Sequence, residues 1–511
     1  MPQNIKRLRS GIIGLLTLAS SLFLVLGSTT AVRAAETLTQ ISSDPYTNPS
    51  SNHKTQVEPD TFAFGNTVVS AFQSGRFFSG GASNIGWATS TNGGKTWTRG
   101  FLPGSTVFAT PHGIYPRASD PSVAYDARHK VWLISWLGLF PQGNTSVVDV
   151  LVSRSTDGGR TFGPPVAVDA SGANLDKNWT VCDNTASSPF FGHCYTEFDD
   201  FGNLNRIQMS TSTNGGATWG APKTTPDRTC VIGGQPVVQP TGTVIVPIDD
   251  CLESVLLSVR STDGGATWTR PVLAAQLLTD THPGAIRAPT LPSAEIDHSG
   301  RVYVTWSDCR FEAGCNAGTN DLVLSTSADG VHWTLPKRIP TAPVGTSADF
   351  LIPGLAVDRS TAGGSAHLAL AYYYFPNASC TPGTCQLKVG FVSSVNGGAS
   401  WSAPEQLAGP MHIEWLPLTS QGFMVGDYIS TSIVPGDDDG TPVFMVAHVP
   451  GSPPSCSNLT TDAPGSDCHQ STYTTPEDLM TITGGPNAAT APSSSAPITR
   501  HSALSTPATA R

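Results

Sequence analysis

The stretch Ser261-Thr262-Asp263-Gly264-Gly265-Ala266-Thr267-Trp268 decides how this chain folds, because it recurs along the sequence in nearly the same form. Five copies have eight residues and a sixth copy is one residue shorter: residues 90–97, 155–162, 212–219, 261–268, 394–401 and, for the short copy, 327–333. The copies start about 50 to 67 residues apart, which is the period of a propeller blade rather than of a helical solenoid. The repeat therefore predicts an all-β protein.

The residue types of the repeat suit a closed turn. An Asp or Asn at its third position, such as Asp263, can bond nearby backbone amides. The paired glycines supply backbone angles that other residues resist. The terminal Trp or Phe can return to an apolar layer between sheets. We interpret the repeat as structural, so we do not count its carboxylates as catalytic candidates.

The pattern Ser-x-Asp/Asn-x-Gly-x-x-Trp/Phe resembles the Asp-box, the bacterial neuraminidase repeat of sialidase-like β-propellers. The resemblance implies a propeller of four-stranded antiparallel blades, which we place at residues 56–483. The strand pattern of each repeat begins a seventh time after the sixth box, with candidate strands at 424–433, 442–448 and 469–474. Seven blades are therefore favoured, and six are the alternative.

Composition fits this fold and excludes one class of partner. Charged residues are only 13 % of the chain, while it has 51 Gly and 41 Pro, as expected for short strands joined by tight turns. The net charge of −10 and the lack of a basic stripe argue against a nucleic-acid partner. We expect a monomer whose partner is a glycan or polysaccharide.

The two ends of the chain differ from the repeats. Residues 1–35 contain basic residues, an apolar run at 11–27 and small residues at 32–34, which predicts a signal peptide. A retained membrane anchor is the alternative, and after signal cleavage no membrane contact is expected. The protein is then secreted or extracytoplasmic. Residues 36–55 are predicted to be a flexible lead-in and residues 484–511 a disordered tail rich in Pro, Ala, Ser and Thr.

Ten cysteines form five pairs of neighbours along the chain, and export together with an even count predicts a disulfide in each pair. The pairs are Cys182/Cys194, Cys230/Cys251, Cys309/Cys315, Cys380/Cys385 and Cys456/Cys468. Zinc is the rival interpretation, but no Cys-x-x-Cys doublet with a His partner is present. We expect no cofactor. Residues 436–440, Gly-Asp-Asp-Asp-Gly, could hold calcium or form a solvated acidic turn.

Candidate site residues follow from position, because first strands of propeller blades line the axis. The axial positions are unusually polar, and buried charges need partners or a function. They are Glu58, Asp60, Arg117, Ser119, Asp120, Asp176, Lys177, Asn178, Gln235, Arg287, Thr290, Asp349, Asp427 and Tyr428. We predict that Arg117, Asp120, Asp176, Arg287, Asp427 and Tyr428 converge at one end of the axis. A purely structural ion network is the alternative.

The sialidase resemblance assigns roles to two of these residues. Ile286-Arg287-Ala288-Pro289 is similar to the motif whose Arg binds the substrate carboxylate, and Asp427-Tyr428-Ile429-Ser430-Thr431 is similar to the strand that carries the Tyr nucleophile. Three departures stand out. Arg287 lies in the fifth repeat rather than the first. The other two arginines and the acid/base Asp of the family have no clear match. Glu414 is the candidate to activate Tyr428.

The resemblance implies a secreted glycoside hydrolase acting on glycan termini, acidic sugars included. Arg117, Arg287 and Asp427 would bind substrate, Tyr428 would be the nucleophile, and Asp120 or Asp176 the proton donor. A non-catalytic propeller that binds glycan or protein is the alternative. A polysaccharide lyase using Tyr428 and His193 is a second alternative.

Overall fold

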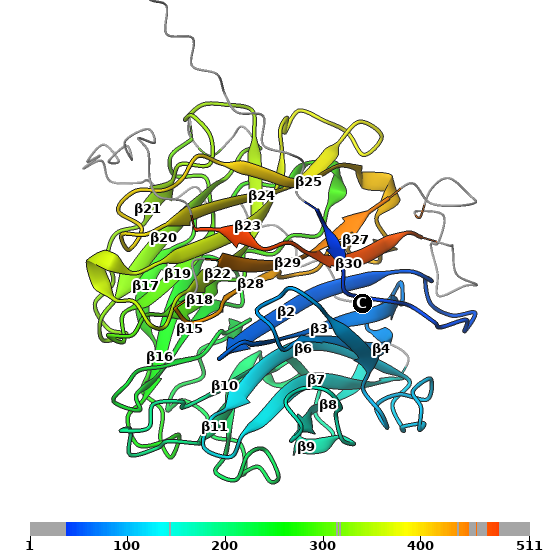
Figure 1. Cartoon of the computed structure of the whole chain (residues 1–511), viewed down its shortest axis with the longest axis vertical. Helices are drawn as coiled ribbons and strands as arrows, with labels where there is room; N and C mark the ends of the chain where they lie inside the picture. Colours follow the sequence, from blue (N-terminus) through cyan, green and yellow to red (C-terminus); the bar gives the residue numbers. More distant parts are fainter. Residues whose placement is uncertain are drawn as a thin grey trace, which may run out of the picture. The chain divides into compact units, whose positions relative to one another are not determined.

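The computed structural model describes residues 37–142, 145–312, 315, 318–436, 439–448, 456 and 468–479. The predicted signal peptide, the predicted tail and residues 437–438 of the acidic turn lie outside these residues. The described chain is almost entirely β (Figure 1). Its helical elements are four short 3-10 turns: η1 (Phe201–Asn203), η2 (Pro283–Ala285), η3 (Gly363–Ser365) and η4 (Ile413–Trp415). No helix in the described ranges is long and apolar enough to cross a membrane.

The largest sheet has eight strands and contains two repeat units. The first unit comprises β2 (Gln56–Phe64), β3 (Thr67–Arg76), β4 (Ala82–Ser90) and β5 (Thr98–Phe101). The second comprises β6 (Arg117–Asp126), β7 (Val131–Gln142), β8 (Thr145–Ser155) and β9 (Val166–Asp169). A single antiparallel pair, Ala82 with Ala118, joins β4 to β6 and merges the two units into one sheet.

The next four repeat units each form a separate antiparallel sheet. The third unit is β10 (Leu175–Cys182), β11 (Cys194–Asp200) and β12 (Arg206–Ser212). The fourth is β13 (Val231–Ile232), β14 (Val237–Val238), β15 (Val244–Asp250), β16 (Val255–Ser261) and β17 (Val272–Gln276). The fifth is β18 (Ser293–Ile296), β19 (Val302–Asp308), β20 (Asp321–Ser327) and β21 (Lys337–Ile339). The sixth is β22 (Asp349–Val357), β23 (Leu368–Phe375), β24 (Gln386–Ser394) and β25 (Glu405–His412).

The last large sheet combines both ends of the described chain. It contains β28 (Ser430–Ile433), β29 (Asp439–Ala447), β30 (Gln470–Thr474), β31 (Glu477–Asp478) and β1 (Thr39–Gln40). β1 falls within residues 36–55, for which the sequence predicted a flexible lead-in, and it pairs with Tyr473 and Thr474 of β30. β26 (Leu418–Thr419) and β27 (Gly422–Phe423) form a separate hairpin.

The predicted propeller of antiparallel blades is confirmed, but the predicted number of four-stranded blades, seven or alternatively six, is not matched. Sheets of four or more strands number five among the described residues, with eight, five, five, four and four strands. Two causes explain the difference. The Ala82–Ala118 pair fuses two units, and the third unit keeps only three strands because its outer segment meets β12 through one isolated bridge, Met209 with Lys223.

One strand from each unit, the first strand except in the fourth unit, where it is β14, nevertheless contacts that of the next unit in a closed order. Contacts run from β2 to β6, β10, β14, β18, β22 and β28, and β28 contacts β2 again. Figure 1 shows β28 and β29 beside β2. The starts of these strands therefore surround a common axis.

The repeated turns hold the units together. In the turn at 261–268, Ser261 Oγ donates to Asp263 Oδ1 at 2.9 Å, and Asp263 Oδ1 accepts the amide of Thr267 at 2.9 Å. The second glycine, Gly265, lies against the preceding unit, because a Cβ there would stand 2.3 Å from Thr211 Oγ1. The aromatic Trp268 is 5 % exposed and packs in an apolar cluster with strands of the third and fourth units. The structural interpretation of the repeat thus agrees with its contacts.

The five predicted disulfides are present and link all ten cysteines: Cys182–Cys194, Cys230–Cys251, Cys309–Cys315, Cys380–Cys385 and Cys456–Cys468. Each closes a short local segment, as their spacing predicted. Cys182 and Cys194, for example, are directly opposite each other on β10 and β11.

Candidate functional site

Bulges at the starts of first strands aim polar side chains at the axis. Glu58, Asp120 and Lys177 have φ of 55°, 48° and 55°, and each lies at a register shift between its strand and the next. Non-glycine residues rarely adopt positive φ, and bulges re-aim side chains. All three residues line one cavity. The local strain thus coincides with the point where three neighbouring units present charged groups.

This axial cavity has a volume of about 200 Å³. Its charged lining comprises Glu58, Arg76, Asp120, Asp176, Lys177 and Arg287. Asp120 and Lys177 also line a smaller cavity of about 30 Å³, together with Asp427 and Tyr428. Of the six residues predicted to converge, five therefore line these two adjoining cavities.

Asp427 is the centre of the ion network. Its Oδ1 accepts a hydrogen bond from Arg287 Nε at 2.6 Å, and its Oδ2 accepts bonds from Arg287 Nη2 and Lys177 Nζ. Asp427 is fully buried, and burial alone would raise its pKa, but the charges of Arg287 and Lys177 hold that pKa below its usual range. The guanidinium that the sequence assigned to a substrate carboxylate is thus already paired with a carboxylate of the protein.

Lys177 and the two candidate proton donors surround this pair. Lys177 Nζ lies 3.5 Å from Asp120 Oδ2. Burial would lower the pKa of Lys177, but Asp427, Asp120 and Asp176 together raise it well above its usual value. Burial raises the pKa of Asp176, which lowers its tendency to ionise in the cavity wall.

Glu58 is a site residue that sequence reasoning placed on the axis but gave no role. Gln73 Nε2 donates to Glu58 Oε2, and the backbone amide of Asp427 donates to Oε1 at 3.4 Å. Burial, followed by the charges of Asp120 and Asp427, raises the pKa of Glu58 to about 8. The sequence does contain a pattern that could have identified Glu58 as a site residue: Glu58-Pro59 and Asp120-Pro121 occupy equivalent points of successive repeats.

Tyr428 lies beside Glu58 but has a backbone partner. Its hydroxyl donates to the carbonyl oxygen of Pro121 at 2.9 Å, and its ring packs edge-to-face on Trp179 with centroids 5.1 Å apart. Burial raises the pKa of Tyr428 well above 10, and Glu58 is the largest of the charges that add to this effect. The phenol is thus protonated at neutral pH. Glu414, the expected activating carboxylate, lies in η4 and lines neither cavity.

Arg117 lies at the rim of the axial cavity. Its Nη1 donates to Ser79 Oγ at 2.8 Å and to the carbonyl oxygen of Gly80 at 2.9 Å, and both of these residues line the cavity. The guanidinium stacks over the ring of Phe77 at 4.2 Å. Arg117 is therefore near the other candidates but directed at the loop between β3 and β4 of the first unit.

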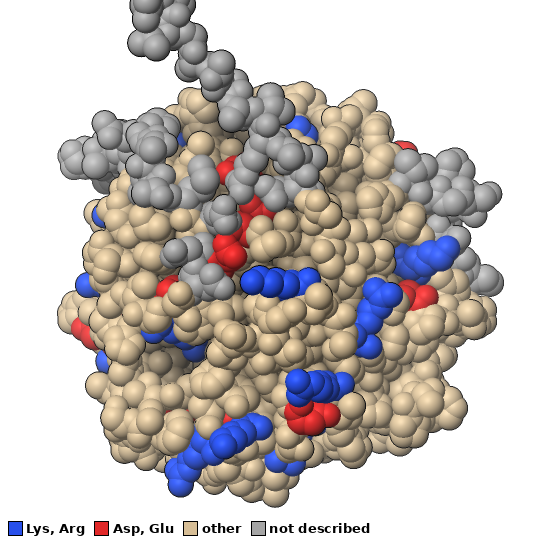
Figure 2. All heavy atoms as spheres, in the orientation of Figure 1, with Lys and Arg blue, Asp and Glu red and all other residues tan. Residues whose placement is uncertain are grey.

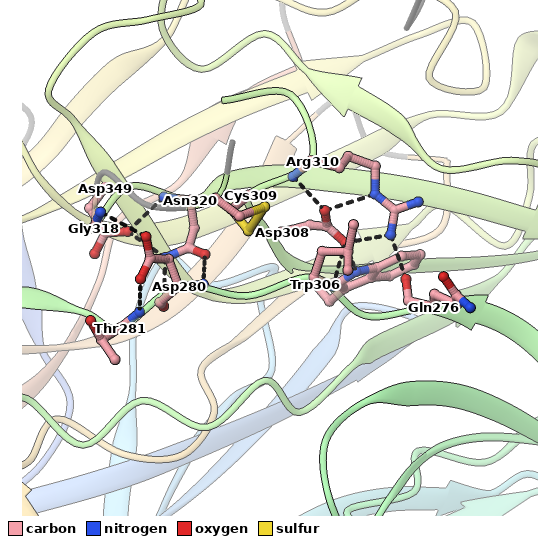
Figure 3. The surroundings of a disulfide bond; sticks show 12 residues. Gln276, Asp280, Thr281, Trp306, Asp308, Cys309, Arg310, Gly318, Asn320 and Asp349 are labelled. Atoms are coloured by element: carbon pink, nitrogen blue, oxygen red, sulfur yellow. Dashed lines mark hydrogen bonds and ion pairs between the residues drawn. A yellow bond between two sulfur atoms is a disulfide. The ribbon is translucent and has the colours of Figure 1, made fainter. Parts of the chain in front are cut away.

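Other axial candidates lie elsewhere. Asp349 begins β22, yet it accepts bonds from Asn320 Nδ2 at 2.8 Å and pairs with His282 at 2.7 Å, beside the Cys309–Cys315 disulfide (Figure 3). Asp60 accepts the amide of Val123 at 2.7 Å, and burial raises its pKa to about 7. His193, the base of the lyase alternative, packs against Phe190 and lines neither of the two cavities.

Two further features bear on ligands. Within the described ranges, no group of three or more His, Cys, Asp or Glu side chains could hold a metal ion. On the face drawn in Figure 2, basic side chains are scattered among uncharged residues rather than joined in a continuous stripe. The polar cavity on the axis is the better candidate site.

No protein-family model matches the chain, and no curated protein matches it. Solved structures do resemble it. Hadza microbial sialidase Hz136 is 13% identical, with 84% of this chain and 68% of that chain covered and a TM-score of 0.44. The NanB sialidase from Streptococcus pneumoniae is 14% identical, with 86% and 71% covered and a TM-score of 0.42. The alpha-L-arabinofuranosidase Arb93A from Fusarium graminearum is 13% identical, with 70% and 98% covered and a TM-score of 0.43.

Sialidases are thus among the structural neighbours, and the repeated turn resembles the same class. At TM-scores below 0.5 these similarities carry no argument about the site. The fold assignment rests on the antiparallel sheets, their closed order and the repeated turns described above.

Proposed function

We propose that the chain is a glycoside hydrolase that acts on glycan termini in the axial cavity. One observation carries the proposal: the carboxyl groups of Glu58, Asp120 and Asp176, from β2, β6 and β10, and the phenol of Tyr428, just before β28, gather around two adjoining cavities. Glycoside hydrolysis needs a proton donor for the leaving group and a nucleophile or base on the other side of the sugar. The cluster supplies groups for both tasks.

Asp176 is the better-supported proton donor. Burial raises its pKa, so its carboxyl group keeps a proton at pH values where an exposed aspartate has lost it. Asp120, the other candidate, is next to it across Lys177 and would polarise the same region of the cavity. Variants of Asp176 and of Asp120 can distinguish their roles, because only the proton donor is required to deliver a proton to the leaving group.

Tyr428 is the proposed nucleophile, and Glu58 the group that takes its proton. Attack on the anomeric carbon requires the phenol to leave the carbonyl oxygen of Pro121 and to lose its proton as the bond to carbon forms. Glu58 has a pKa of about 8 and is the carboxylate with the largest effect on Tyr428. Turnover that depends on this transfer should rise as the pH approaches 8.

The test is hydrolysis of fluorogenic sialosides, uronides and neutral glycosides by the purified mature chain. We expect the variants Tyr428→Phe and Asp176→Asn to lower turnover of the accepted substrate at least 100-fold, within the range known for general acid catalysis. Asp349→Asn, a buried carboxylate outside the cavities, is the matched control and should keep full activity. Unchanged turnover by Tyr428→Phe would remove it as nucleophile.

Absence of hydrolysis by folded protein would remove the hydrolase proposal and favour the non-catalytic binding module.

We also propose that the mature chain is exported and monomeric. Five local disulfides support export, because such bonds persist in oxidising compartments. Light scattering on the purified chain tests the monomer.

A further inference from the structure

We propose that the sugar bound in the axial cavity is uncharged, and that Asp427 sets this specificity by occupying Arg287 and Lys177. The proposal rests on the proposed glycan site and names its substrate class. Asp427 is then a specificity-determining residue that stands where the carboxylate of an acidic sugar would otherwise bind.

Arg287 already has a carboxylate partner within the protein. A guanidinium recognises a carboxylate through two parallel N–H groups. Arg287 already directs Nε and Nη2 at the two carboxylate oxygens of Asp427. The Asp427 side chain has no exposed surface, while the Arg287 side chain is 21 % exposed. The cavity is therefore lined by an arginine whose two aligned donors already bind Asp427. A substrate carboxylate would have to displace a buried one.

The other cations of the lining are Lys177 and Arg76. Lys177 is shared between Asp427 and Asp120. Arg76 Nη1 donates to the carbonyl oxygen of Gly81 at 2.9 Å and to Gln73 Oε1 at 3.4 Å, and its buried Nε has no hydrogen-bond partner among the described residues. The same lining presents the carboxyl groups of Glu58, Asp120 and Asp176. An acidic sugar that entered this lining would lose hydration while Arg287 and Lys177 are already paired with Asp427, which is unfavourable without a dedicated partner.

Asn178 Oδ1 is a buried acceptor with no hydrogen-bond partner among the described residues, and Asp120 Oδ2 has only its ion pair with Lys177 Nζ at 3.5 Å. Such groups are costly unless a ligand or water satisfies them. Asp120 lines both cavities and Asn178 lines the smaller one, so both acceptors belong to walls that a bound sugar would contact. Sugar hydroxyls are donors as well as acceptors, and a neutral sugar supplies them without adding charge.

The experiment measures binding rather than turnover, by ligand-observed NMR at neutral pH. The probes are methyl β-D-galactopyranoside and methyl α-L-arabinofuranoside as neutral sugars, and N-acetylneuraminic acid and methyl β-D-glucuronide as acidic ones. We expect the wild-type chain to bind at least one neutral probe at least tenfold more tightly than either acid. Tighter binding of an acid, or binding of none of the four, would overturn the proposal.

The variant Asp427→Asn sharpens the test, because it keeps the shape of the side chain but removes its charge and one of the two acceptors that bind Arg287. Folded Asp427→Asn should bind an acidic probe at least tenfold more tightly than the wild type does, and Asp349→Asn should not. No gain in folded Asp427→Asn would overturn the role of Asp427. If this variant does not fold, the wild-type preference decides alone.

Binding and hydrolysis separate the two proposals. A chain that binds neutral probes but cleaves no glycoside supports this inference and removes the hydrolase. A chain that cleaves sialosides supports the hydrolase and overturns this inference.

Discussion

Carboxylates serve opposite purposes in the repeated turns and at the axis. Asp157, in the second turn, is exposed, and although burial would raise its pKa, hydrogen bonds from Thr161, Ser155 and Arg160 lower that pKa to about 2. Glu58 is buried, and its pKa rises to about 8. The partners of Asp157 all belong to its own turn, whereas Glu58 meets groups from other strands. The carboxylate of Asp157 is hydrogen-bonded within its own turn and stabilises that turn. The carboxyl group of Glu58, whose neighbours come from distant strands, keeps a raised pKa and can take part in proton transfer.

The largest expected effect separates the two regions by activity. Asp176→Asn should lower turnover of the accepted glycoside by about 10² to 10⁴, the usual contribution of a general acid. Its melting temperature should stay the same or rise, because a half-buried carboxyl group with a raised pKa is removed. Asp157→Asn is the control and should keep wild-type turnover. Equal losses of turnover in the two variants would contradict the assignment of catalysis to the axial carboxylates rather than to those of the turns.

The second effect separates them by stability. Trp268→Ala should lower the free energy of unfolding by about 3 to 5 kcal/mol, because truncation of a buried aromatic leaves a cavity. Turnover per folded molecule should stay unchanged, since Trp268 lines neither cavity. Chemical denaturation measures the change. An unaltered midpoint would show that the aromatic residues of the turns do not lock neighbouring units.

The third effect is the pH dependence of stability. Burial raises the pKa of Glu58 to about 8, of Asp60 to about 7, and of Glu197 and Asp199 well above their usual values. In the unfolded chain such groups titrate near pH 4. Between these pKa values the folded protein binds more protons than the unfolded chain, so stability falls as pH rises, by at most about 1.4 kcal/mol per pH unit for each group.

Unfolding free energies measured from pH 4.5 to 8 check this sign. Glu197→Gln should flatten the slope, because it removes one titrating group at a site that lines neither cavity. Asp427 has a lowered pKa, so its contribution to stability is constant above the unfolded pKa of about 4 and is lost as the pH falls below it. A stability that increases with pH across the measured range would contradict the buried, protonated carboxyls.

The smallest effect is expected for Asp263→Asn. Asn214 stands in the same position of another turn, where its Oδ1 accepts the amide of Thr218 at 3.0 Å and its Nδ2 reaches Thr218 Oγ1 at 2.8 Å. Asn can thus replace Asp at a cost of no more than about 0.5 kcal/mol. Asp263→Ala removes the acceptor and should cost about 1 kcal/mol. Thermal melts that place the two variants at equal loss would show that the carboxylate charge matters.

The sequence predicts features that depend on neighbours in the chain. The turns were visible because their hydrogen bonds stay within eight residues, and the strands between them follow from the same period. Asp120, Asp176 and Arg287 line the same cavity, and the sequence placed each of them at or before the first strand of its own unit, the second, third and fifth. Sequence reasoning could not choose Glu58 over Glu414 as the neighbour of Tyr428, because that choice depends on contacts across the ring.

Pairing between distant side chains was equally out of reach. Nothing in the sequence around Arg287 indicates that its guanidinium pairs with Asp427, 140 positions later. Asp349 has the expected position, but His282 and Asn320 hold it away from the cavity. The single Ala82–Ala118 pair that fuses two units is likewise a consequence of strand geometry rather than of residue type.

The pairing of β1 with β30 has a consequence for biosynthesis. The amide of Thr472 donates to Ser42 Oγ, 430 positions away, so the final sheet needs both ends of the described chain. During translation the amino-terminal strand emerges first and has no partner until the last units have been made. A product that stops before β30 keeps an unpaired strand edge, which invites pairing with other chains. Premature termination should therefore yield aggregated or degraded protein rather than a smaller working ring.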